Sequence, residues 1–366
     1  FFVVLFFPGT PLLGLLCTVS DSLLTLLENF AGAAADLDFA SLVTGRPPAV
    51  YFALVWIALI LLLLSVEKKQ RDIRVLGFLM AAVGLFFFAH QLDPSGKVVM
   101  LDVGQGDAIL IITPFHRSAV LIDTGGVITF EREAWQVRET ATTAGEKLVS
   151  IIKAEGVKKL DRVFLTHADQ DHVGSLRELA EGLPIDAVYF PKGAEGNAAF
   201  AAVLLELQSQ HQVGLFPLLG KVDLEIDADF VFHILAPLAP GEGGNEDSLV
   251  IQTSIGGLDW LFTGDLGEEG EEVLMRTYPD LKTDVLKIGH HGSATSSSEG
   301  FLDHVQPELA LISAGKQNRY GHPDAQILER LELRNIPIFR TDRQGAIHFL
   351  YGSEETEWRT ILENKK

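Results

Sequence analysis

The strongest constraint on the fold is a run of 18 residues without a charge, "AVYFALVWIALILLLLSV", from Ala49 to Val66. A helix needs about 20 consecutive apolar residues to cross the hydrocarbon core of a bilayer. A second charge-free run, from Val75 to Ala89, is shorter. We expect both runs to form transmembrane helices rather than helices buried in a soluble core, because their length and lack of charge suit lipid.

The short segment between the two runs, "EKKQRDIR", indicates how this helical hairpin is oriented. Its acidic residues are outnumbered by its basic residues, which are Lys68, Lys69, Arg71 and Arg74. Short loops rich in Lys and Arg stay in the cytoplasm. The turn is therefore expected inside the cell. The part of the chain after the second run is expected on the exterior or periplasmic side of the cell (inner) membrane.

The opening run, "FFVVLFFPGTPLLGLLCTVS", has no initiator Met and no charged start, so it is not typical of a signal peptide. We interpret it as the end of a longer, multi-pass membrane region whose earlier helices are missing from this sequence. Its continuation, "DSLLTLLENFAGAAADLDFASL", mixes acidic with apolar residues and is typical of an interfacial helix.

Breakers at Pro94, Ser95 and Gly96 predict a boundary between a membrane region, residues 1–92, and a globular domain, residues 97–366. Within the globular part, short β-type runs alternate with helical patterns. The strands fall into two groups, each interleaved with helices. This order predicts an α/β fold of two face-to-face sheets with helices outside, an αββα sandwich.

Composition excludes two classes of site. A single cysteine, Cys17 in the apolar region, rules out an internal disulfide and a cysteine-rich zinc site. The net charge of −20 argues against DNA binding through a broad basic surface. Chemistry on a polyanion then requires a metal or a local basic patch that reverses the sign of the charge.

The segment "THADQDH" places two histidines and two aspartates in six positions, directly after the predicted strand "DRVFL". On such a loop His167 and Asp169 can reach one metal, while Asp171 and His172 reach a second one. Two cations about 3.5–4 Å apart that share a water lower its pKa and clamp both oxygens of a displacement. A polar turn with an N-cap aspartate is the competing interpretation, and four ligand types at this spacing disfavour it.

Two later strand ends supply the remaining ligands of such a site. Asp265 follows the strand in "DWLFTGD" and is placed to bridge both metals. His290 and His291 follow the strand in "DVLKIGHHGS", and one of them completes the second metal, with His291 favoured. The competing interpretations are an ordinary turn aspartate for Asp265 and a polar loop for the two histidines. The cluster in "THADQDH" disfavours both.

These residues resemble a known family. "THADQDHVGSL", "IDTGG", "FTGD" and "HHGS" resemble the strand-end motifs of the metallo-β-lactamase superfamily. "LDVGQGDAILI", "DVLKIGHHGSATSS" and "NRYGHPDAQILERL" resemble more narrowly the C-terminal domain of the ComEC family, the membrane channel for DNA uptake in natural competence. The resemblance covers essentially the whole chain. It implies a metallo-β-lactamase-like sandwich preceded by transmembrane helices.

The resemblance implies a binuclear, metal-dependent hydrolase, a nuclease that degrades one DNA strand while the channel passes the other. The wider superfamily usually has histidine where this chain has Asp169, and another ahead of the "TGD" strand. Here that region reads "GGNEDSLV", with Asn245, Asp247 and Ser248, so the third ligand of the first metal stays open. His233 lies in a predicted strand and is expected to be a core residue. Carboxylate in place of imidazole shifts the preference from Zn²⁺ toward Mn²⁺ or Mg²⁺, and we expect two divalent ions, with Mn²⁺ as the activator rather than Zn²⁺.

Other polar residues are candidates for substrate contact. Gln105 and Asp107 in "LDVGQGD" either orient ligands or substrate, or belong to a glycine hairpin. Ser293 either meets a phosphate or caps the next helix. In "RYGHP", Arg319 is a substrate candidate, and His322 is expected to act with Asp171 in catalysis by protonating the leaving oxygen, unless it is an ordinary surface histidine.

The expected partners are single-stranded DNA as substrate, membrane lipid, and, by the resemblance, a DNA receptor and other competence proteins. Two other functions compete with the nuclease. One is a metallohydrolase of esters, thioesters or lactams, which usually keeps the full histidine set. The other is a domain without catalysis that binds or gates DNA at the channel. The metal content of the purified protein distinguishes them.

Overall fold

The computed structural model describes residues 11–35, 43–68, 73–126, 142–227, 230–316, 318–352 and 356–362. The chain divides into two compact units, Phe1–Val43 and Thr44–Lys366. In the first unit, α2 runs from Pro11 to Ala35 as one helix, which includes most of the stretch expected to form an interfacial helix. Within this helix, the hydroxyl of Ser22 donates to the Thr18 carbonyl one turn earlier, as mid-helix serines commonly do.

The apolar hairpin of the second unit consists of α3 (Ala49–Glu67) and α4 (Ile73–Phe88). Phe52 and Phe86 meet edge to face with ring centroids 4.8 Å apart, so the start of α3 lies against the end of α4. Among the described residues, α3 alone is long and apolar enough to cross a membrane. α4 has 16 residues, fewer than the roughly 20 that a helix needs to cross the hydrocarbon core of a bilayer. Part of the basic turn, residues 69–72, lies outside the described residues.

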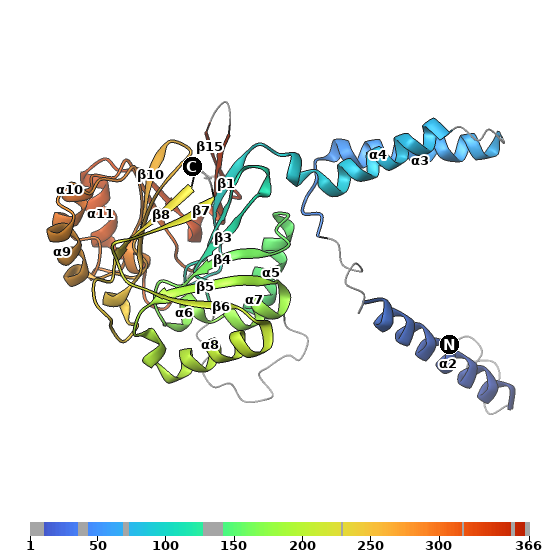
Figure 1. Ribbon diagram of the computed structural model, residues 1–366, viewed down its shortest axis with the longest axis horizontal. Helices are drawn as coiled ribbons and strands as arrows, with labels where there is room; N and C mark the ends of the chain where they lie inside the picture. The colour runs from blue at the N-terminus through green and yellow to red at the C-terminus, as the bar shows by residue number, and fades with distance from the viewer. Residues whose placement is uncertain are drawn as a thin grey trace. The chain divides into compact units, whose positions relative to one another are not determined.

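The rest of the second unit is built on two β-sheets (Figure 1). The first sheet has the order β15-β14-β1-β2-β3-β4-β5-β6 and the second β13-β12-β11-β10-β9-β8-β7. The strands of the first sheet are β1 (Gly96–Met100), β2 (Ile109–Ile112), β3 (Ala119–Ile122), β4 (Leu160–Phe164), β5 (Ile185–Pro191), β6 (Gly214–Leu218), β14 (Ile347–Tyr351) and β15 (Glu357–Thr360). Those of the second are β7 (Val222–Asp227), β8 (Phe230–Ala236), β9 (Val250–Ile255), β10 (Leu258–Phe262), β11 (Val285–Lys287), β12 (Leu309–Ile312) and β13 (Ile338–Arg340).

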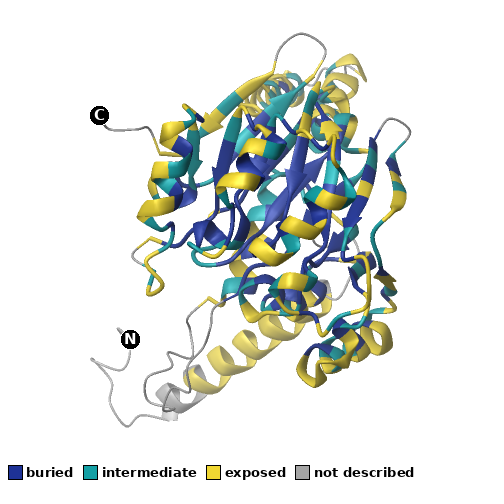
Figure 2. Ribbon diagram, turned by 90° about the vertical axis from the view of Figure 1, so that its left-hand side faces the viewer, coloured by how far each residue is buried: buried dark blue, intermediate teal, exposed yellow. Residues whose placement is uncertain are grey.

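Helices cover the outer face of each sheet, and the strands between them are buried (Figure 2). The main helices are α5 (Ala144–Ala154), α7 (Leu176–Gly182) and α8 (Ala198–His211) on the first sheet, and α9 (Glu268–Thr277), α10 (Glu299–Val305) and α11 (Ala325–Leu333) on the second. Short helical turns are η1 (His90–Leu92), η2 (Pro114–His116), α6 (Gln170–Val173), η4 (Ala194–Gly196), η5 (Asn245–Asp247), η6 (Gly289–Gly292) and α12 (Thr341–Gln344). Apolar clusters fill the space between the sheets and beneath each helical layer. The predicted αββα sandwich is therefore confirmed.

Strand direction explains where a site can form. β3, β4 and β5 are parallel in the first sheet, and β10, β11, β12 and β13 in the second. Parallel strands present their carboxyl ends, and the loops that follow them, at one edge of a sheet. β1 and β2 are antiparallel neighbours, so the turn between them lies at the same edge as the end of β3.

Some local predictions were wrong or incomplete. β6, β7 and β15 were not predicted, and Ser293 does not cap the next helix, α10, whose N-cap is Ser298. His233 does lie in a strand, β8, but it is exposed and pairs with Asp223 across 2.7 Å. Successive side chains of a strand point to opposite faces, so Phe232 enters the core between the sheets while His233 points away from it.

Truncation of Phe232 to Ala should destabilise the protein, because this ring is fully buried between the sheets. We expect the free energy of unfolding to fall by about 3–5 kcal/mol. Leu333→Ala is the control, since Leu333 is 74% exposed; it should change stability by less than about 0.5 kcal/mol. Urea unfolding followed by tryptophan fluorescence measures both, and equal effects of the two variants would contradict the packing described.

Candidate metal centre

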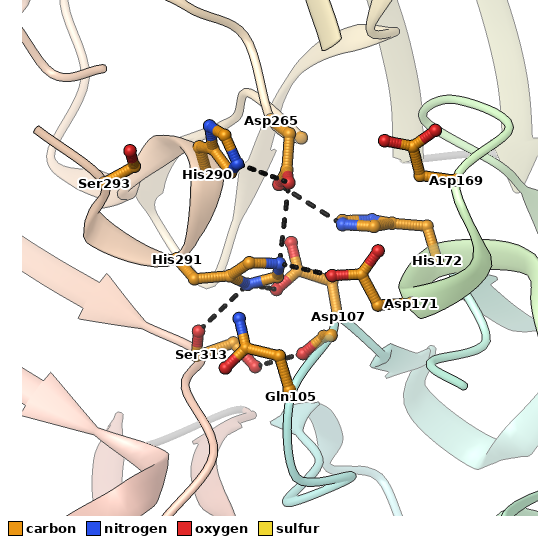
Figure 3. A network of polar contacts seen from close by, with 12 residues as sticks. Gln105, Asp107, Asp169, Asp171, His172, Asp265, His290, His291, Ser293 and Ser313 are labelled. Atoms are coloured by element: carbon orange, nitrogen blue, oxygen red, sulfur yellow. Dashed lines mark hydrogen bonds and ion pairs between the residues drawn. The ribbon is translucent and has the colours of Figure 1, made fainter. Parts of the chain in front are cut away.

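Side chains from both sheets converge on one buried cluster where the strand ends meet (Figure 3). Asp107 precedes β2, His172 lies in α6 after β4, Asp265 follows β10 and His291 lies in η6 after β11. One ligand atom from each of these four residues lies within 4.8 Å of the others, and all four residues are buried. The arrangement brings together residues that are up to 184 positions apart in the sequence (291 minus 107).

Unusual backbone conformations aim these side chains. Asp123, His290 and His291 have φ values of 57°, 47° and 54°, in the left-handed region that costs a non-glycine residue of order 1–3 kcal/mol. Gly106, at φ 118°, lets the β1–β2 turn pass directly over α6, because an added Cβ would lie 2.1 Å from the Asp171 carbonyl oxygen. The close approach at Gly106 therefore packs the β1–β2 turn against α6, the two segments that carry Asp107 and His172.

His172 is oriented from behind by Asp123. The Asp123 carboxylate accepts from His172 Nδ1 at 2.8 Å and from the Thr166 hydroxyl at 2.7 Å. With Nδ1 bonded in this way, His172 Nε2 faces Asp265 Oδ1 at 3.2 Å. A carboxylate behind a histidine fixes its tautomer and ring orientation, as it does for histidines that bind metals.

His291 is held on both ring nitrogens. Nδ1 contacts the Ser313 carbonyl at 3.1 Å and Asp107 Oδ1 at 3.4 Å. Nε2 lies 3.2 Å from Asp171 Oδ2 and 3.5 Å from Asp265 Oδ2. The neighbouring His290 is 28% exposed, with Nε2 3.9 Å from Asp265 Oδ2. Of the two histidines, His291 is the buried member of the cluster.

A buried ion pair lies beneath the cluster. Lys287, the last residue of β11, pairs with Asp107 and donates to the Gly264 carbonyl at 3.3 Å. Burial acts to raise the pKa of Asp107, but the Lys287 ammonium and His291 hold that pKa below its usual range. Burial acts to lower the pKa of Lys287, but Asp107 and Asp265 raise it. Both partners are therefore charged inside the protein.

The carboxylates also set the charge of the histidines. Burial opposes a charged imidazole, yet Asp265 and Asp107 raise the pKa of His291 to about 9. Asp265 and Asp123 raise the pKa of His172 well above its usual value against the same burial. Burial acts to raise the pKa of Asp265 itself, but His291 and His172 hold it well below its usual range. The carboxylates of the cluster therefore stabilise positive charge at the position of His172 and His291.

The donor set fits divalent cations. Four buried polar atoms at the cluster make no hydrogen bond; they are His167 Nε2, His172 Nε2, Asp107 Oδ1 and Asp265 Oδ1. A buried polar atom without a partner costs of order 1–3 kcal/mol. Imidazole nitrogen and carboxylate oxygen are the ligands that Zn²⁺ and Mn²⁺ accept in proteins. A bound cation would satisfy these atoms and balance the carboxylates.

The other predicted residues lie around this cluster. His167 is buried, and its Nε2 is 3.6 Å from Asp169, whose side chain is 57% exposed and stands apart from the cluster in Figure 3. Gln105 accepts from the Gly315 amide at 3.3 Å. Ser293 is buried and contacts the Thr295 hydroxyl at 3.0 Å.

Two predicted residues belong to the loop after β12. The ring of His322 lies near those of His290 and His291, with centroids 5.6 and 6.5 Å away. Arg319 is exposed on the same loop.

The region considered for a third ligand does not supply one in the structure. The Asp247 carboxylate accepts from the amides of Glu242 and Gly243, at 2.8 and 3.0 Å. The Ser248 hydroxyl accepts from the Asp265 amide at 3.2 Å. These residues shape the loops next to Asp265.

Sequence reasoning missed three supporting residues, Asp123, Thr166 and Lys287. Asp123 carried a signal, because it ends a predicted strand in "IDTGG", where only Thr124 separates it from two glycines. Asp107 was predicted as a substrate contact, whereas the structure places it in the cluster.

The geometry agrees with comparison to known proteins. The family model described as the metallo-beta-lactamase superfamily matches residues 101–316. The chain belongs to the metallo-beta-lactamase superfamily. The matched segment of this superfamily contains every residue of the buried cluster.

Relatives of the superfamily domain and the preceding helices are competence and recombination proteins by name. The chain is 37% identical over 336 residues to ComE operon protein 3 of Bacillus subtilis (strain 168), covering 90% of this chain and 43% of that protein. It is 31% identical over 327 residues to Competence protein ComA of Neisseria gonorrhoeae, covering 87% and 41%. It is 28% identical over 294 residues to Recombination protein 2 of Haemophilus influenzae, covering 79% and 34%. The resemblance to the ComEC family is confirmed, and the chain spans less than half the length of these relatives.

The buried pair of Lys287 and Asp107 can be tested by a double-mutant cycle. Lys287→Met leaves the buried Asp107 carboxylate without its cation, so the free energy of unfolding should fall by about 3–5 kcal/mol. Adding Asp107→Asn should restore a large part of this loss, because the uncompensated charge is then gone. Urea unfolding with EDTA present measures the four proteins, and simple additivity of the two losses would show that the pair is not coupled.

Proposed function

We propose that this chain is part of a DNA-uptake protein whose C-terminal domain, residues 97–366, hydrolyses DNA phosphodiesters with two divalent metal ions. The observation that carries the proposal is the buried cluster of Asp107, His172, Asp265 and His291 with its unsatisfied donor atoms. The named relatives support nucleic acid as the substrate. Residues 1–92 would belong to the membrane region, with the hydrolase domain outside the cell membrane.

Each residue has a defined task under this proposal. His167 and Asp169 would hold one metal, Asp171, His172 and His291 the other, and Asp265 would lie between them. Asp123 and Ser313 hold His172 and His291 in the orientations that direct their Nε2 atoms inward. When bound, the two cations supply Lewis acidity toward the phosphate and acidify a water molecule. Lys287 keeps Asp107 ionised beneath them.

His322 is the candidate for proton transfer. It borders the histidine pair, and its Nδ1 is buried without a hydrogen bond. Burial and the positive charges of His290 and His291 lower the pKa of His322. A lowered pKa leaves the imidazole mostly neutral near neutral pH, so under this proposal His322 would first accept a proton and then give it to a leaving oxygen within reach.

Loss of the central ligands should abolish hydrolysis. We expect Asp171→Asn and His172→Ala each to lower kcat on single-stranded DNA by on the order of 10²–10³-fold or more, as for loss of a major electrostatic contact. His233→Ala is the matched control, because His233 is an exposed histidine whose ion-pair partner among the described residues is Asp223. Retained activity in both site variants, in the full chain in detergent with added metal, would refute the proposal.

Metal preference follows from the ligands. With two carboxylates beside two histidines in the cluster, and Asp169 as a further carboxylate ligand under this proposal, we expect Mn²⁺ to activate more strongly than Zn²⁺. Titration of the EDTA-treated chain with either ion, read both as bound metal by mass spectrometry and as nuclease rate, measures this. Maximal turnover with stoichiometric Zn²⁺ alone would contradict it, and no bound metal at all would favour a DNA-binding or gating domain.

A further inference from the structure

The loop after β12 is a fixed turn beside the cluster. The Asn318 side-chain amide donates to the carbonyls of Gly315 and His322, at 2.9 and 2.5 Å, and its oxygen accepts from the His322 amide at 3.0 Å. Gly315 also donates to Gln105 in the β1–β2 turn. Asn318 therefore ties the start of the loop to its end, and Gln105 ties the loop to the site.

Three aromatic rings run outward from the cluster along this loop. His291 and His322 have centroids 6.5 Å apart and planes 28° apart. His322 and Tyr320 follow at 5.7 Å and 27°. Both spacings lie within the range of stacked rings. Two successive ring contacts thus connect Tyr320 to His291, a histidine of the buried cluster.

The Tyr320 side chain is exposed although its position is fixed. It is 55% exposed, so its ring contributes little burial to the core. Lys316 and Arg319 are exposed on the same loop, in a protein whose net charge is −20. An aromatic face accompanied by two cations, close to a phosphate-binding centre, is the combination that binds single-stranded nucleic acid by stacking and charge.

We infer that Tyr320 is the stacking platform for an unpaired nucleobase of the DNA strand being cleaved, with Lys316 and Arg319 contacting its backbone. The inference rests on the proposed function. In a duplex the base faces are covered by neighbouring bases, and exposing one costs a few kcal/mol. The platform therefore selects single strands over duplex DNA.

Binding measurements isolate the role of the base. The full chain in detergent, loaded with Ca²⁺ to suppress cleavage, is titrated into a fluorescent oligothymidylate and into an abasic strand of equal length, with anisotropy as readout. We expect wild type to prefer the thymidylate strand by roughly tenfold. Tyr320→Ala should remove this preference, Tyr320→Phe should retain it, and so should Phe216→Ala, which removes another exposed aromatic ring on β6.

Three results would overturn the inference. These are a wild type that does not distinguish the two strands, a Tyr320→Ala variant that still does, and an equal loss of affinity for both strands in that variant. The proposed nuclease fails separately: if no metal supports hydrolysis while Tyr320→Ala removes base-dependent binding, the platform stands and the hydrolase does not. If hydrolysis occurs but the base preference is unchanged in Tyr320→Ala, the hydrolase stands and the platform does not.

Discussion

Buried negative charge is the constraint on which the rest of this structure depends. A carboxylate inside a protein costs several kcal/mol unless cations or hydrogen bonds compensate it. Lys287 compensates Asp107, and Asp123 is compensated by His172 and Thr166. Asp265 has imidazoles near it but an oxygen that makes no hydrogen bond. Asp265 raises the pKa of both His172 and His291, so a divalent cation at the centre would replace the protons that these imidazoles otherwise hold.

Neither sheet could hold this balance alone. Asp107 and His172 come from the first sheet, whereas Asp265, Lys287 and His291 come from the second. Their contacts form only when the apolar cluster between the sheets is packed, since that packing fixes the separation of the strand ends. Left-handed conformations at the histidine pair and close approach at Gly106 are tolerated because the sheets on either side determine them.

Ligands that directly follow a strand could be predicted from the sequence. Residues whose role depends on a partner far away in the chain could not. "HADQDH", "TGD" and "HHG" follow apolar strands directly, so strand ends and candidate ligands could be predicted together. Lys287 sits in an apolar run, and its need for Asp107, 180 residues earlier (287 minus 107), is a tertiary property. His233 was placed in the correct strand but on the wrong face, because its short run of apolar neighbours obscures the two-residue period. The strands β6 and β7 carry proline and exposed polar residues, respectively, which weakened their pattern.

Exposure within the site sets the direction from which a substrate would approach under the proposed function. Asp107, His172 and His291 are buried, whereas the Asp169 side chain is 57% exposed and that of His290 is 28% exposed. An ion held by His167 and Asp169 would therefore keep more contact with solvent than one held by His172 and His291. The ring series that leads to Tyr320 begins at the same histidine pair. Under the proposed function, a strand that reached the metals beside His290 would also meet the ring series that leads to Tyr320.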